Sequence, residues 1–269
     1  MIGEFAAKSG IIEKISPEGV QASIDLQGGY LNSLTAPDST DILFPRQDLD
    51  GKDRGAVFFC MPFGPAVQQG MEQHGFARRL TWEHVDTPDD PNGIMLWLDN
   101  PRLQDPGLPE EYDGCSITLR YEPVAINNED GTSAYGFTAT ATIMNKGDKP
   151  FITAPAFHPY LPVSEGKNAL DGTFSVLGSR PSAQELDDTI FVPTEDGRAS
   201  YSDGLHTWVV TGNDMSVYAL WTNKPEAFVC VEPSMCGDAE QQQEPPVLQP
   251  NESVKVSMTL LRTDFATKT

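Results

Sequence analysis

The chain has 269 residues and a formal net charge of −21, from 18 basic and 39 acidic residues. Nucleic-acid binding depends on neutralising phosphates with Lys and Arg, and anionic membrane surfaces also attract basic segments, so this charge argues against both partners. A chain of this length can bury a large core without disulfides and still be one large β domain. We therefore expect one domain over residues 1–269 with an acidic, solubilising surface.

Short runs that alternate apolar and polar residues follow one another along the chain, separated by turn-forming Gly, Pro, Asn and Asp. Such alternation, rich in Val, Ile, Thr and aromatic residues, is typical of half-buried β-strands. No sustained helical stripe occurs, and residues 182–188 are expected to form one or two helical turns at most. Strands are predicted at residues 20–26, 94–99, 116–124, 136–145, 206–212, 216–222, 227–233 and 254–263.

This pattern predicts a nearly all-β protein with many antiparallel strands. Long free strand edges promote aggregation, so the strands are expected either to close into a barrel or to stack as two sheets. No internal repeat and no low-complexity linker divides the chain. Residues 234–253 are the least structured stretch, which we expect to be a surface loop before the last strand.

The cysteines Cys60, Cys115, Cys230 and Cys236 are scattered and form no CxxC pair, so their spacing predicts neither a zinc site nor a disulfide framework. The first three lie in apolar or alternating runs, which is typical of buried free thiols. The first 15 residues lack the apolar core of a signal peptide, and no apolar run approaches the roughly 18 residues that span a bilayer. We expect a soluble cytoplasmic protein.

Two of the four histidines stand out by their neighbours. His74 lies between nearby glycines, which let a backbone approach a ligand closely, and His158 precedes a proline, which favours an extended conformation. Taken singly, each is more often a structural residue than a catalyst. His84, at the end of a probable strand, and His206, at the start of another, are expected to be structural.

A carboxylate interrupts the apolar strand FVCVEP at residues 228–233. By alternation, Glu232 shares one face with Phe228 and Cys230. A carboxylate on such a face is costly to bury unless it is paired or functional, and the alternative is a strand-end side chain that reaches solvent. Spacing alone does not choose between them. A zinc site is a weak alternative, because the histidines are widely spaced and show no local metal-binding signature.

Three motifs together resemble the signature regions of the aldose 1-epimerases, the galactose mutarotase-like family. They are QHGFARRLTW at residues 73–82, FHPYL at 157–161 and FVCVEP at 228–233. Residues 24–47 resemble the opening hairpin of that family and residues 248–261 its closing strand, so the resemblance covers the chain end to end. It implies an all-β fold, a large antiparallel β-sandwich with few short helices.

The resemblance also implies an acid–base reaction without a metal or organic cofactor. His158 matches the general acid of the family and Glu232 matches its general base. The base would remove the C1 hydroxyl proton of a sugar while the acid protonates the ring oxygen. A nearby carboxylate, such as Glu232 or Asp188, is expected to raise the pKa of His158 and keep it a proton donor at pH 7.

Four further residues match substrate-binding positions of the family. His74 corresponds to the histidine that holds the sugar ring, and Arg78 to an arginine of the same motif. Arg54 resembles the sugar-contacting arginine of hexose-6-phosphate mutarotases. Asp188 resembles a ligand-binding aspartate, although Thr189 replaces the usual basic residue that follows it.

The leading hypothesis is an aldose 1-epimerase that interconverts the α and β anomers of a hexose, as a monomer or homodimer. One alternative is a hexose-6-phosphate 1-epimerase, in which Arg54, Arg78 and Arg79 would bind phosphate. Another is a non-catalytic sugar-binding or sensor protein, because a fold does not fix a function. Candidate aromatic platforms for the sugar, each of which could instead pack in the core, are Phe63, Phe76, Tyr160 and Trp221.

Overall fold

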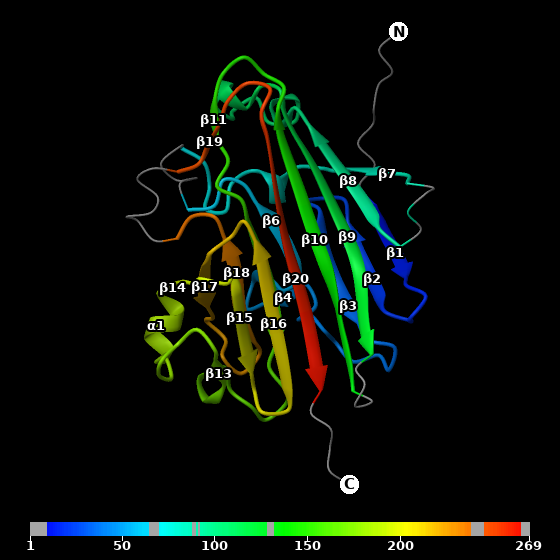
Figure 1. The fold of residues 1–269 in the computed structure, drawn as a ribbon, viewed down its shortest axis with the longest axis vertical. Coiled ribbons are helices and arrows are strands. Elements are labelled where there is room, and N and C mark those ends of the chain that lie inside the picture. The colour runs from blue at the N-terminus through cyan, green and yellow to red at the C-terminus, as the bar shows by residue number, and fades with distance from the viewer. Residues whose placement is uncertain are drawn as a thin grey trace.

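The computed structural model describes residues 10–64, 70–87, 90, 92–127, 132–237 and 245–264. Two eight-stranded antiparallel sheets stack face to face (Figure 1). The first, called sheet I, runs in the order β1 (Ile11–Ile15), β2 (Gln21–Asp25), β3 (Tyr30–Thr35), β6 (Val57–Cys60), β12 (Ala156–Pro162), β18 (Phe228–Ser234), β17 (Val217–Trp221) and β14 (Ile190–Pro193).

The second sheet, sheet II, holds the longest strands. Its order is β13 (Thr173–Phe174), β15 (Arg198–Ser202), β16 (His206–Asn213), β20 (Ser253–Asp264), β10 (Ser133–Asn145), β9 (Cys115–Asn127), β8 (Ile94–Asp99) and β7 (Glu83–Val85). Two small sheets pair β4 (Gln47–Leu49) with β5 (Lys52–Arg54), and β11 (Phe151–Ile152) with β19 (Val247–Leu248).

Helices are short and few in the part of the chain that the structure describes. The α-helix α1 spans Ala183–Asp187, and a reciprocal capping box between Ser182 and Glu185 fixes its start. Single 3₁₀ turns lie at Ala77–Arg79, Pro101–Leu103, Glu110–Tyr112 and Ala169–Asp171. No helix among the described residues is long and apolar enough to cross a membrane.

The structure confirms the predicted all-β sandwich. Each of the eight predicted strands is present, and the short predicted helix at residues 182–188 is α1. The predicted surface loop at 234–253 is only partly a loop, because β19 pairs with β11 and Cys236 is buried. Residues 238–244 of that prediction lie outside the described residues.

Sheet I is buried on both faces at its centre, and this feature positions the site. On one face, side chains such as Phe59, Phe157 and Val229 join the main core between the two sheets. On the other face, Phe58 and Tyr160 belong to a second apolar cluster. Strands buried on both faces read as continuous apolar runs, which is why the central strands of sheet I show little alternation.

Candidate active site

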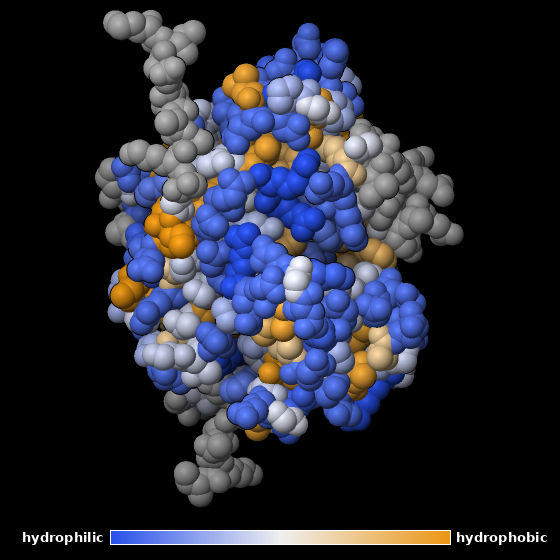
Figure 2. Space-filling model, turned by 180° about the vertical axis from the view of Figure 1, so that it is seen from behind, coloured by the Kyte–Doolittle hydropathy of each residue, from blue (hydrophilic) through white to orange (hydrophobic). Residues whose placement is uncertain are grey.

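A cavity of about 570 Å³ is lined by side chains from the face of sheet I that points away from sheet II. Figure 2 shows the molecule from this side, where mostly hydrophilic side chains cover the surface. All six site residues predicted from the sequence line the cavity. They are Arg54, His74, Arg78, His158, Asp188 and Glu232.

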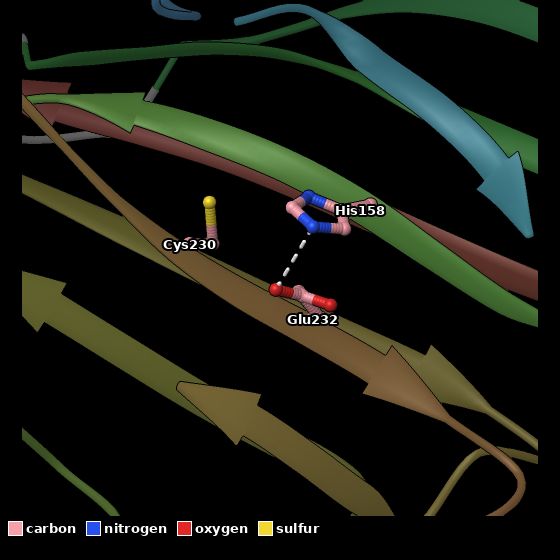
Figure 3. A group of neighbouring side chains, drawn as sticks. All are labelled: His158, Cys230 and Glu232. Carbon is pink, nitrogen blue, oxygen red and sulfur yellow. Dashed lines mark ion pairs between the residues drawn. The ribbon is translucent and has the colours of Figure 1, made fainter. Parts of the chain in front are cut away.

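His158 and Glu232 face each other at the floor of this cavity. His158 lies on β12 and Glu232 on β18, and the register of these neighbouring strands, with Ala156 opposite Ser234 and Tyr160 opposite Cys230, places them side by side. The Nε2 atom of His158 lies 3.2 Å from Oε1 of Glu232, and each residue is 3% exposed (Figure 3). The solvent-facing alternative for Glu232 is therefore wrong.

Aromatic rings fix the plane of the His158 imidazole. Phe58 stacks on it with ring centroids 4.6 Å apart, and Tyr160 stacks on it at 4.9 Å. His74 meets the same imidazole edge-on, at 5.0 Å and 88°. Because the ring is stacked on Phe58 and Tyr160, its rotamer is fixed and its Nε2 atom stays directed toward Glu232.

His74 is placed by an unusual backbone segment. Its φ is +70°, a left-handed conformation that is uncommon for a residue with a side chain, and Gly75 follows at +73°. A Cβ on Gly75 would lie 1.9 Å from the carbonyl oxygen of Met61, so only glycine fits this approach. The His74 ring then stacks on Phe63 at 5.6 Å. This explains the role of the glycine after His74 in the motif.

Burial sets the protonation of the central pair. It lowers the pKa of His158 well below the ordinary value of 6.5, and the neighbouring His74 ring and Arg78 guanidinium lower that pKa further. Burial also raises the pKa of Glu232 well above 4.5. Both shifts favour the neutral forms, so the pair holds one proton as a carboxyl group beside a neutral imidazole. The expectation that a carboxylate raises the pKa of His158 is wrong, because burial dominates.

His74 is neutral for a related reason. Burial lowers its pKa to about 3, and the nearby guanidinium groups of Arg78 and Arg54 act in the same direction. At pH 7 its imidazole therefore carries one N–H donor and one acceptor nitrogen. Its Nδ1 atom is buried and has no hydrogen-bond partner within the described structure. A neutral ring with one unpaired nitrogen is suited to bind a hydroxyl group.

Arg54 and Arg78 are the cationic side chains of the cavity. Arg54 lies over the Trp221 ring at 5.2 Å and Arg78 over the Phe58 ring at 5.4 Å. Within the described structure neither forms an ion pair with a carboxylate, whereas Arg79 pairs with Glu72 and Asp105 and does not line the cavity. The inclusion of Arg79 among the phosphate-binding candidates is therefore not supported.

Asp188 lies at the rim rather than the floor. It caps the C-terminal end of α1, is exposed, and accepts a 2.8 Å hydrogen bond from Nε2 of Gln184. The following Thr189 has a φ of +71°, a rare conformation for a β-branched residue, and turns the chain directly into β14. The side chains of Asp53 and Asp187 also line the cavity, although the sequence motifs did not identify them.

Three of the four predicted aromatic platforms line the cavity, namely Phe63, Tyr160 and Trp221. Phe76 instead packs in the main core, where it meets Tyr112 edge-on. His84, on β7, lies 3.8 Å from a carboxylate oxygen of Asp86, and neither it nor His206 on β16 lines the cavity. Their expected structural role agrees with these positions.

Two curated proteins match part of the chain. No family model matches the chain. A Salmonella typhimurium protein named "Putative glucose-6-phosphate 1-epimerase" is 32% identical over 168 residues, which are 60% of this chain and 50% of that protein. An Escherichia coli K12 protein of the same name is 39% identical over 82 residues, 29% of this chain and 28% of that protein. The matches thus span half or less of the curated relatives.

Solved structures match nearly the whole chain. A galactose mutarotase-like protein from Lactobacillus casei has a TM-score of 0.73 at 16% identity, with 94% of this chain and 100% of the other covered. This chain has the galactose mutarotase-like fold. A "putative mutarotase" from Salmonella typhimurium, at 21% identity, has a TM-score of 0.66 over 95% of this chain and 90% of the other. The β-sandwich fold that the motif resemblance implied is thereby confirmed.

Proposed function

We propose that the protein is an aldose 1-epimerase that interconverts the α and β anomers of a hexose. The observation that carries this proposal is the buried His158–Glu232 pair, with 3.2 Å between Nε2 and Oε1, at the floor of a cavity of sugar-binding size. The similarity to proteins named as 1-epimerases supports it.

Glu232 is the general base and His158 the general acid in this proposal. The single proton of the pair moves across the 3.2 Å contact to His158 as the sugar binds, which leaves a carboxylate to accept the C1 hydroxyl proton. The imidazolium then protonates the ring oxygen as the C1–O5 bond breaks. The open-chain aldehyde rotates about C1–C2, and the same steps in reverse close the other anomer. The chemistry conserves protons, so the pair ends as it began.

The walls of the cavity supply groups for orienting the sugar. His74, Arg78, Arg54 and Asp188 offer donors and acceptors to ring hydroxyls. Trp221 and Tyr160 offer apolar faces, which suit the C–H faces of a hexose. Every one of these residues lines the cavity.

A phosphorylated hexose is the second candidate substrate, and a specific observation favours it. The chain has a net charge of −21, yet Arg54 and Arg78 line the cavity without a carboxylate partner within the described structure. Guanidinium groups bind phosphate through paired N–H donors, so they would supply a phosphate subsite away from C1. The names of both curated relatives point to the same class of substrate.

The test is anomer exchange measured by NMR with glucose, galactose and glucose 6-phosphate. The wild-type protein should accelerate exchange, and His158→Ala should abolish the acceleration. Arg54→Met should raise KM for glucose 6-phosphate by roughly 10- to 100-fold, the value of a lost charged hydrogen bond, and change KM for glucose far less. Arg79→Met is the matched control, because that arginine does not line the cavity.

Each other result has a distinct meaning. If Arg54→Met weakens both sugars equally, the arginine contacts the ring and the phosphate subsite is wrong. If the wild-type protein binds sugar but accelerates no exchange, the protein is a sugar-binding or sensor protein on this fold.

A further inference from the structure

A third reactive side chain, Cys230, lies beside the central pair and has no part in the proposed reaction. Cys230 and Glu232 are two residues apart on β18, so the pleat of the strand directs both to the same face. Figure 3 shows the thiol on the same side of β18 as the carboxylate, with His158 projecting toward them from β12. Their ligand atoms, namely the thiol sulfur, an imidazole nitrogen and a carboxylate oxygen, all lie within 4.8 Å of one another.

These separations approach those of a tetrahedral zinc site. With Zn–N and Zn–O bonds of about 2.0–2.2 Å and a Zn–S bond of about 2.3 Å, neighbouring ligand atoms lie roughly 3.4–3.6 Å apart. The 3.2 Å between Nε2 of His158 and Oε1 of Glu232 is already close to that value. Only the sulfur has to approach, by roughly 1.2–1.4 Å at most, which a rotation about χ1 of Cys230 can supply.

We propose that His158, Cys230 and Glu232 form a binding site for Zn²⁺ or a similar thiol-seeking divalent cation, and that an ion bound there blocks the acid–base pair. A nitrogen, a sulfur and a carboxylate oxygen are the three ligand types that zinc uses most. His158 and Glu232 both line the cavity, so water or a sugar hydroxyl from the cavity can complete the coordination.

Charge balance favours this site despite two nearby guanidinium groups. Zinc requires a thiolate and a carboxylate, so binding releases about two protons, one from the thiol and one from the His–Glu pair. The ion and its two anionic ligands then sum to no net charge, which avoids the cost of burying an unpaired charge. Arg54 and Arg78 oppose a free cation on approach, and this opposition should slow entry more than it weakens the neutral bound state.

Blocking follows from the same atoms. An ion on Nε2 of His158 occupies the position that the shared proton needs, and an ion on Glu232 removes its capacity as a base. The blocking effect rests on the proposed epimerase function, whereas metal binding itself does not. The two can therefore fail separately.

The experiment uses the purified full-length chain with Co²⁺ and Zn²⁺. Co²⁺ should produce a thiolate-to-metal charge-transfer band in the near ultraviolet, at one ion per chain, and Zn²⁺ should displace it. Cys230→Ala should remove the band and weaken Zn²⁺ binding by more than about 10- to 100-fold. That range is the typical loss of affinity when only an outer-shell partner of a metal ligand is removed. Cys60→Ala is the matched control, because this buried thiol belongs to the same apolar cluster but not to the group of three.

The outcomes decide the proposal directly. A band that is present in the wild type and Cys60→Ala and absent in Cys230→Ala supports the site. Absence of the band in the wild type overturns it, as does Zn²⁺ affinity that is equal in the wild type and Cys230→Ala, which would place the ion on surface carboxylates. Anomer exchange measured with Zn²⁺ then tests blocking, and exchange unaffected by a bound, displaceable ion would overturn that part alone.

Discussion

Replacing Glu232 with glutamine tests the central pair with the smallest change in shape. The substitution keeps the volume and a hydrogen-bonding group 3.2 Å from His158, but it removes the group that can gain and lose a proton. A positioned general base typically contributes about 10²–10⁴-fold, so kcat should fall by that factor, which corresponds to about 2.7–5.4 kcal/mol of transition-state stabilisation. KM should change little, because the hydrogen-bonding shape of the floor is retained.

The same substitution should raise the free energy of unfolding above neutral-carboxyl conditions, although it lowers kcat. The pKa of Glu232 is raised in the folded state above its unfolded value near 4.5. The contribution of Glu232 to the free energy of unfolding is therefore fully present below pH 4.5. It is lost as the pH rises toward the folded pKa, because the unfolded chain then ionises more readily. Glutamine does not ionise, so the variant should become more stable relative to the wild type as the pH rises above 4.5 toward the folded pKa of Glu232.

Two measurements check this reasoning. Anomer exchange by NMR gives kcat and KM, and urea unfolding at several pH values gives the free energy of unfolding. Glu226→Gln is the matched control, because Glu226 is exposed just before β18 and should alter neither quantity by much. A Glu232→Gln variant that keeps kcat within tenfold of the wild type would refute the assignment of Glu232 as the base. A stability difference that does not change with pH would refute the raised pKa.

Three further predictions concern the surroundings of the pair. The acid limb of the kcat/KM profile should have its midpoint below pH 6.5, because burial lowers the pKa of His158. The alkaline limb should report the raised pKa of Glu232. An acid midpoint at or above pH 6.5 would contradict this prediction. Gly75→Ala should destabilise the fold by at least about 1–3 kcal/mol in thermal unfolding, since its Cβ meets the Met61 carbonyl at 1.9 Å. Phe58→Leu should lower kcat severalfold with little change in KM, because loss of the stacked ring lets the His158 imidazole rotate. An unchanged kcat would show that Tyr160 alone holds the imidazole in place.

The outline of the fold could be predicted because sheet II follows the simplest rule of strands. Residues 116–124 and 136–145 alternate between core and surface, and both predicted strands are present as β9 and β10. Two central strands of sheet I do not follow this rule. β6 and β12 are buried on both faces, so their sequences carry no period of two, and neither was predicted from alternation.

The site illustrates a different limit of sequence analysis. Glu232 could be singled out because a carboxylate breaks an apolar run, but spacing could not tell whether it reaches solvent or a partner. That depends on β12 lying next to β18, a pairing between segments about 70 residues apart in the chain. The motif resemblance supplied the partner, His158, whereas Asp53 and Asp187, next to Arg54 and Asp188 in the chain, were not singled out and were recognised only as cavity walls.

Chemistry and recognition come from different parts of this architecture. His158 and Glu232 project from adjacent central strands of sheet I, where packing on both faces leaves their side chains little freedom. The remaining walls come from the end of the β4–β5 hairpin, the turn that holds His74, and the end of α1. Loops tolerate substitution better than buried strands do. We therefore expect substitutions in the walls to change which sugar binds, and substitutions in β12 or β18 to change whether any sugar reacts.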